Sequence, residues 1–176
     1  MVHRYYHRLS HWQQRVYRQS DLVTTVSVPA AVGLAELTLA VGQALTRGEP
    51  RATALACTRL LRRVCARLGV TPPAITVLAE RPAGHWGELH GLYNPAQGPN
   101  GTITVWMHTA KRGRVVAFRT FLRTLLHELC HHLDFALLRL SHSFHTTGFY
   151  KRESSLCKQL LPVAKPRPVG APSGAT

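Results

Sequence analysis

The strongest constraint in this sequence is a long amphipathic pattern over residues 114–140. Apolar side chains recur at the three- and four-residue spacing of a single helix face, at Phe118, Leu122, Leu125, Leu129, Leu133, Ala136 and Leu140. A second face carries small or polar side chains, namely Thr120, Thr124, His127, His131 and Asp134. The pattern predicts a helix that buries one face in a core and leaves the other free to form a site.

The sequence His-Glu-Leu-Cys-His, at residues 127–131, lies within this predicted helix. Residues four apart on a helix lie one turn above the other, so His127 and His131 can bind one metal ion. Glu128 is offset around the helix and is the candidate general base, which would take a proton from a metal-bound water. The alternative interpretation is a buried helix whose histidines are satisfied by ordinary hydrogen bonds.

Two histidines leave a catalytic metal site incomplete, because such sites usually have three protein ligands. The downstream candidates are Asp134, His142, His145 and Glu153. His145 is favoured, because a helix that ends near residue 141 runs about 14 Å past His131 and the extended residues after it can return about 17 Å. Glu153 is the alternative third ligand, and Asp134 is expected to orient an imidazole. Histidine ligands favour zinc over harder cations, so Zn²⁺ is the predicted cofactor.

The motif at residues 127–131, followed after thirteen residues by His145-Thr146-Thr147-Gly148-Phe149, resembles SprT-like (Spartan-like) zinc metalloproteases of the HExxH zincin superfamily. In that family a third histidine opens a short glycine-containing turn before a helix. The resemblance implies that His127, His131 and His145 bind zinc and that Glu128 is the general base. It extends in outline over residues 75–162. Two threonines separate His145 from Gly148, and the sequence has no Cys-rich zinc ribbon, which many members carry.

The segments around the motif predict an α+β fold. Helical patterns cover residues 29–46 and 50–68, and the alternation typical of strands follows at residues 74–78, 86–93 and 102–107. The metal-binding helix and a last helix to about residue 161 come next. This order is expected of a zincin-like minimal metalloprotease domain, in which a sheet of about three strands packs on the metal-binding helix. We expect the last strand, with Trp106 and Met107, to be the edge to which a peptide substrate adds.

Three regions follow from this reading. Residues 1–70 are expected to form a basic, helical N-terminal region, and residues 71–162 the zincin-like catalytic domain. Residues 163–176 are rich in Pro, Gly, Ala and Ser, a composition typical of a disordered tail.

The charge of the chain is strongly positive. Lys and Arg outnumber Asp and Glu by 22 to 8, giving a formal net charge of +14 and a pI near 10.8. Such a chain attracts polyanions, most commonly nucleic acid. Arginines and aromatic residues alternate within residues 3–18, which suits phosphate contacts and base stacking. The sequence therefore predicts a nucleic-acid partner for the N-terminal region, in addition to a protein or peptide substrate.

Cysteine usage and hydropathy bear on the compartment. The four cysteines form no Cys-x-x-Cys pair and lie in apolar helical patterns, so we expect buried free thiols and a cytoplasmic protein. The apolar segment at residues 22–45 contains Pro29 and Glu36. Because an acidic side chain at the centre of a membrane span costs about 2.5–3.5 kcal/mol, no stable membrane insertion is expected.

Two functional hypotheses follow. The first is a zinc-dependent metalloendopeptidase, which hydrolyses peptide bonds through a zinc-bound water activated by Glu128 and is recruited to DNA or to DNA-bound proteins. The alternative is a basic nucleic-acid-binding protein with a structural or degenerate metal site.

Overall fold

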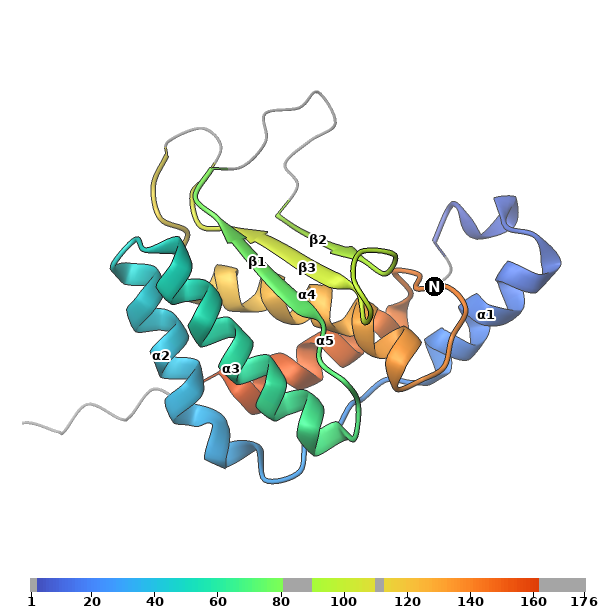
Figure 1. Cartoon of the computed structure of the whole chain (residues 1–176). Helices are drawn as coiled ribbons and strands as arrows, with labels where there is room; N and C mark the ends of the chain where they lie inside the picture. Colours follow the sequence, from blue (N-terminus) through green and yellow to red (C-terminus); the bar gives the residue numbers. More distant parts are fainter. Residues whose placement is uncertain (1–2, 81–89, 110–112, 162–176) are drawn as a thin grey trace, which may run out of the picture.

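A computed structural model describes residues 3–80, 90–109 and 113–161, and these form a mixed α+β fold, as predicted (Figure 1). The N-terminal part contains helices α1 (His11–Leu22), α2 (Ala35–Thr46) and α3 (Pro50–Leu68), with short 3-10 helices η1 (Tyr6–Arg8) before α1 and η2 (Ala31–Leu34) before α2. The rest contains strands β1 (Ala74–Leu78), β2 (Gly91–Asn94) and β3 (Thr102–Trp106) and helices α4 (Phe118–Ala136) and α5 (Thr147–Leu160).

The three described strands form one sheet in the order β1–β3–β2. Strand β3 is central, pairing with β1 in parallel and with β2 in antiparallel register. The prediction that residues 102–107 form the free edge is therefore wrong. The central position explains why the side chains of β3 are the most buried of the sheet. Strand β2, which is short and begins with a glycine, is the edge strand beside α4.

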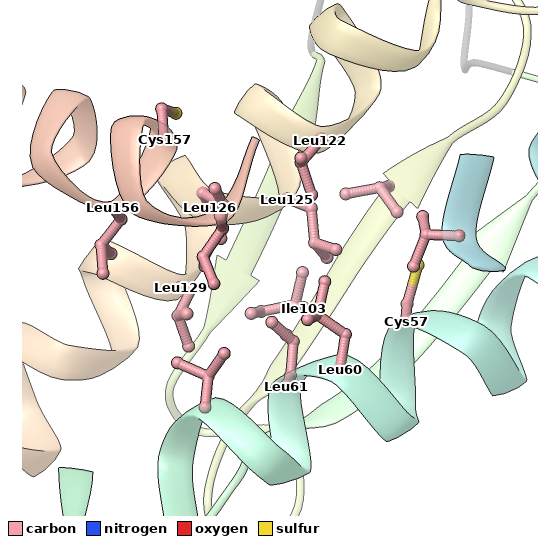
Figure 2. Close-up of a cluster of buried hydrophobic side chains, with 14 of the residues drawn as sticks. Cys57, Leu60, Leu61, Ile103, Leu122, Leu125, Leu126, Leu129, Leu156 and Cys157 are labelled. Carbon is pink, nitrogen blue, oxygen red and sulfur yellow. The ribbon is translucent and has the colours of Figure 1, made fainter. Parts of the chain in front are cut away.

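Helices α3 and α4 cover one face of the sheet, and the core lies between these helices and the sheet (Figure 1). Leu60 and Leu61 of α3 meet Leu125 and Leu129 of α4 around Ile103 (Figure 2). Each such fully buried aliphatic side chain contributes about 1.5–3 kcal/mol relative to an exposed one. This single cluster contains residues from both sides of residue 70, the boundary expected between the N-terminal region and the catalytic domain.

Local capping explains where the helices begin and end. In α1, Ser10 and Gln13 form a reciprocal capping box. Helix α3 has Pro50 at its first turn and ends at Gly69, which has the positive φ of 69° that favours glycine. The helix predicted at residues 50–68 is confirmed, whereas the one predicted at residues 29–46 begins as η2 and is α-helical only from Ala35.

Helix α4 is shorter than the helix predicted at residues 114–140. At its start, Val115 pairs with His108 in an isolated bridge, so the chain is still extended before Phe118. At its end, Arg139 has a φ of +56° and the backbone N–H of Leu140 donates to the carbonyl of Asp134. Helix α4 thus ends about one turn earlier than expected.

Two predictions fall wholly or partly on residues that the structure does not describe. The strand expected at residues 86–93 is observed at Gly91–Asn94, and residues 86–89 lie outside the described ranges. The tail at residues 163–176 also lies outside them. Among the helices that are described, none combines the length and the hydropathy needed to cross a membrane.

Candidate metal centre

Three histidines converge beside α4. His127 and His131 lie on consecutive turns of this helix, and His145 lies in the loop that joins α4 to α5. The Nε2 atom of His145 is 3.0 Å from Nε2 of His127 and 3.0 Å from Nε2 of His131. Within the described part of the chain these are the residues whose ligand atoms are grouped closely enough to hold a metal ion.

The spacing of these nitrogens fits a metal ion better than a set of hydrogen bonds. Nitrogen ligands 2.0–2.1 Å from a tetrahedral zinc ion lie about 3.3 Å apart, close to the 3.0 Å observed. A neutral imidazole carries one N–H, so three converging Nε2 atoms cannot satisfy one another fully. The donor set therefore suits a cation such as Zn²⁺.

Hydrogen bonds at Nδ1 determine which nitrogen of His127 is free to bind a metal. Nδ1 of His127 lies 2.9 Å from Oε2 of Glu153, whose other oxygen accepts from Arg123. These two partners lower the pKa of Glu153 against the opposing effect of burial. Because an ionised carboxylate only accepts, Nδ1 carries the hydrogen and the lone pair of His127 lies on Nε2. Glu153, the alternative third ligand, therefore contacts Nδ1 of His127, and it does not belong to the group of three converging side chains.

His131 is oriented by a longer chain of contacts. Its Nδ1 lies 2.7 Å from the hydroxyl of Ser143, which donates at 2.7 Å to Oδ2 of Asp134. The other oxygen of Asp134 forms a fully buried ion pair, 2.8 Å long, with Arg152. Since the hydroxyl hydrogen of Ser143 is given to Asp134, Ser143 accepts from His131, and Nε2 again keeps its lone pair. Asp134 therefore orients an imidazole as expected, although through Ser143.

The surroundings keep His131 and His145 neutral, the form that binds metals. Burial lowers the pKa of His131 to about 3, and the neighbouring histidines lower it further in the same direction. Burial also lowers the pKa of His145, and His127 adds to the effect. The buried ring of Phe149 forms the apolar floor, with its centroid 4.6–5.1 Å from those of the three imidazoles.

Glu128 is placed next to the histidines but outside their group. Its side chain is buried, and this burial raises its pKa to about 7, against the opposing effects of His127 and a hydrogen bond from the Tyr93 backbone. A carboxyl group with a pKa near neutrality can both accept and release a proton at physiological pH. Glu128 therefore has the properties of a general base.

The three histidines and Glu128 line an open cavity of about 970 Å³ between β2, α4 and the start of α5. The predicted polar face of α4 contributes Thr120 and Thr124 to its wall, whereas Asp134 is buried behind it. His142 and Tyr150 also line the cavity. Arg152 does not, because it is held by Asp134 and by the backbone carbonyl and hydroxyl of Ser20.

Sequence reasoning did not identify Ser143, Gly91 or the pairing of Arg152 with Asp134. Ser143 lies two residues before His145, and a hydroxyl at that spacing is too common to predict a role. Gly91 is the residue of β2 that lies against Glu128, and the close approach could be inferred only after strand order was known. No protein-family model, curated protein or solved structure matches this chain.

Proposed function

We propose that this chain is a zinc-dependent metalloendopeptidase of the SprT-like type with a zincin-like catalytic fold. One observation carries the proposal: a buried glutamate with a pKa near 7 lies in the same cavity as three histidines whose Nε2 atoms converge. Structural zinc sites need no such carboxylate, whereas hydrolytic sites do.

Each residue of the site has a separate role in the proposed reaction. His127, His131 and His145 would hold the zinc ion. Glu153 keeps the Nε2 lone pair of His127 free, and Ser143 does the same for His131. A bound zinc ion supplies Lewis-acid chemistry, which polarises a carbonyl group and makes water a better nucleophile. The carboxylate of Glu128 takes a proton from water and then gives this proton to the leaving amine. Burial of Glu128 favours both transfers, because a carboxyl group with a pKa of about 7 gains and loses a proton with similar ease near pH 7.

The position of β2 supports a peptide as the substrate. Strand β2 is an edge of the described sheet, and Gly91, Leu92 and Tyr93 of this strand line the cavity. An extended peptide can pair with such an edge through main-chain hydrogen bonds, which fixes its carbonyl groups without requiring a particular sequence. Because Gly91 adjoins Glu128, a peptide on this edge would lie within reach of the general base.

The surface charge supports recruitment to a polyanion such as DNA. Three acidic residues, Glu128, Asp134 and Glu153, are buried together with one arginine, Arg152, so the surface is more basic than the composition alone indicates. Exposed arginines lie along α1 and α3, at Arg15, Arg18, Arg51, Arg59, Arg62 and Arg63. Fewer aromatic side chains than predicted are available to stack on bases. Trp12 is 44% exposed, whereas Tyr17 is buried.

The decisive experiment measures cleavage of a basic, unfolded model protein by the zinc-loaded wild type and by Glu128→Gln and His131→Ala. Glu36→Gln is the matched control, since Glu36 is an exposed glutamate on α2. We expect cleavage by the wild type and by the control, and none by the other two variants. Cleavage by Glu128→Gln at the wild-type rate would contradict the proposed mechanism.

Recruitment is tested separately by DNA binding at several salt concentrations. We expect the affinity to fall steeply with salt, because phosphate contacts release counterions. Strong DNA binding by a zinc-loaded protein that cleaves no substrate would favour the alternative, a nucleic-acid-binding protein with a structural metal site.

A further inference from the structure

The loop that carries His145 has little internal support. It joins the end of α4 to the first residue of α5, and the one backbone hydrogen bond formed within residues 141–146 runs from Thr146 N–H to the carbonyl of Phe144. A metal ligand on so irregular a segment must be positioned by contacts from elsewhere, because metal affinity depends on ligands held near their binding geometry.

Ser143 of this loop contacts Asp134 and His131 of α4. Further contacts come from the N-terminal segment, defined here as residues 3–23. The hydroxyl of Tyr5 donates to the backbone carbonyl of His145 at 3.3 Å. The ring of Trp12 meets the ring of His142 edge-on at 4.8 Å. Tyr17, which is 2% exposed, packs near Phe144 with 6.0 Å between ring centroids. Three side chains of this segment therefore contact three residues of the His145 loop.

The same segment also anchors the beginning of α5. A carboxylate oxygen of Asp21 accepts from the backbone N–H of Gly148 at 2.7 Å, across 127 residues of sequence. The two chains are so close that a β carbon on Gly148 would come within 2.4 Å of the Asp21 carbonyl oxygen. This contact lies just after Thr146, whose hydroxyl caps α5, so it fixes the end of the loop nearest His145.

A third connection leads to His131. Arg152 donates to the backbone carbonyl of Ser20 at 2.6 Å and to its hydroxyl at 2.9 Å, while the same guanidinium pairs with Asp134. Asp134 in turn holds Ser143, the partner of His131. The C-terminal end of α1 is thus connected to two of the three candidate metal ligands.

We infer that residues 3–23 form a clamp that is part of the metal centre, and that high metal affinity requires this clamp to be docked. Tyr5, Trp12 and Asp21 are positioning residues, since they act on the metal through the His145 loop and do not contact it. The inference requires only that the three histidines bind a metal ion and is independent of the proposed peptidase activity.

Because coupling between two events is reciprocal, metal binding must also hold the clamp in place. Arg15 and Arg18 of α1 have exposed side chains, so trypsin can report whether the segment is docked. We expect zinc to slow tryptic cleavage at these two arginines in the unmodified protein. Equal cleavage rates in metal-free and zinc-loaded protein would overturn the inference, whatever the behaviour of any variant.

The direct test titrates Zn²⁺ and Co²⁺ into Asp21→Ala and into the double variant Tyr5→Phe/Trp12→Ala. Gln19→Ala is the matched control, because Gln19 is exposed on the same helix. We expect about 10–100-fold weaker metal binding in the clamp variants, as for other residues that support ligands, with a changed visible spectrum of bound Co²⁺ and unchanged helical circular dichroism. The control is expected to stay within twofold of the wild type.

Wild-type affinity and an unchanged Co²⁺ spectrum in both folded clamp variants would contradict the inference. If Asp21→Ala does not fold, the double variant and the trypsin experiment decide the question. If the wild type itself binds no metal, the result contradicts the metal centre as well as the clamp.

Discussion

The backbone of Gly91 lies directly against the side chain of Glu128, so closely that a β carbon at this position would come within 2.6 Å of a carboxylate oxygen and 2.7 Å of Cγ. The same β carbon would be 2.9 Å from a methyl group of Thr124. Only glycine allows the edge strand to approach Glu128 in this way. This contact joins the strand proposed to bind the substrate to the residue proposed to move the proton.

Gly91→Ala is therefore expected to displace Glu128 while leaving the three histidines in place. A misplacement of about 1 Å can reduce a rate on the order of 100-fold, so we expect a loss of that size in peptide cleavage with normal zinc content. Leu78→Ala is the control, since this residue of β1 is 44% exposed and does not line the cavity. Undiminished cleavage by Gly91→Ala would show that this contact does not position the general base.

Ser143→Ala removes the hydroxyl between His131 and Asp134. His131 then loses the acceptor that holds its hydrogen on Nδ1, and we expect zinc affinity to fall about 10–100-fold. Competition with a chelator of known affinity measures the change. Ser141→Ala provides a control in the same loop, because Ser141 is exposed. Equal zinc affinities for the two variants would show that Ser143 does not support the metal centre.

The buried ion pair between Asp134 and Arg152 makes a prediction about stability. Its two side chains are 0% and 1% exposed. Asp134→Ala leaves the guanidinium buried without its counter-ion, which costs about 3–5 kcal/mol. Urea unfolding of the metal-free protein measures the difference. The double variant Asp134→Leu/Arg152→Met is expected to lose less, because no uncompensated charge remains. A loss below about 1 kcal/mol in Asp134→Ala would show that water relieves the charge.

The thiols of the core predict a pH dependence far from the metal site. Cys57 and Cys65 are buried and free, as the sequence predicted, and burial raises the pKa of each from 9.0 to about 12. Burial opposes the charged form, so the folded protein should keep these thiols protonated between pH 9 and 11. We expect slow reaction with an alkylating reagent throughout this interval and fast reaction in urea. Alkylation of both residues at pH 9 without unfolding would contradict the packing described for α3.

Local rules predicted the parts of the site that lie on one helix. The spacing of His127 and His131 places both on one face of α4 because four residues make about one turn, and the reach of the following chain favoured His145 over more distant candidates. The grouping of His127, His131 and His145 could be anticipated in this way without knowledge of the rest of the fold.

Relationships between distant segments could not be predicted in the same way. The position of β3 at the centre of the sheet depends on its parallel pairing with β1, for which the sequence contains no local signal. The end of α4 depends on the positive φ of Arg139, a conformation uncommon for this residue type. The clamp of residues 3–23 depends on contacts across more than a hundred residues, which composition and periodicity do not specify.

The central claim is that His127, His131 and His145 together hold a metal ion. The most direct test is the zinc content of the purified protein by elemental analysis, for the wild type and for His145→Ala, with His11→Ala as an exposed histidine control. We predict about one zinc ion per chain in the wild type and the control and a large loss in His145→Ala. Equal zinc content in all three proteins, or none in the wild type, would contradict this account.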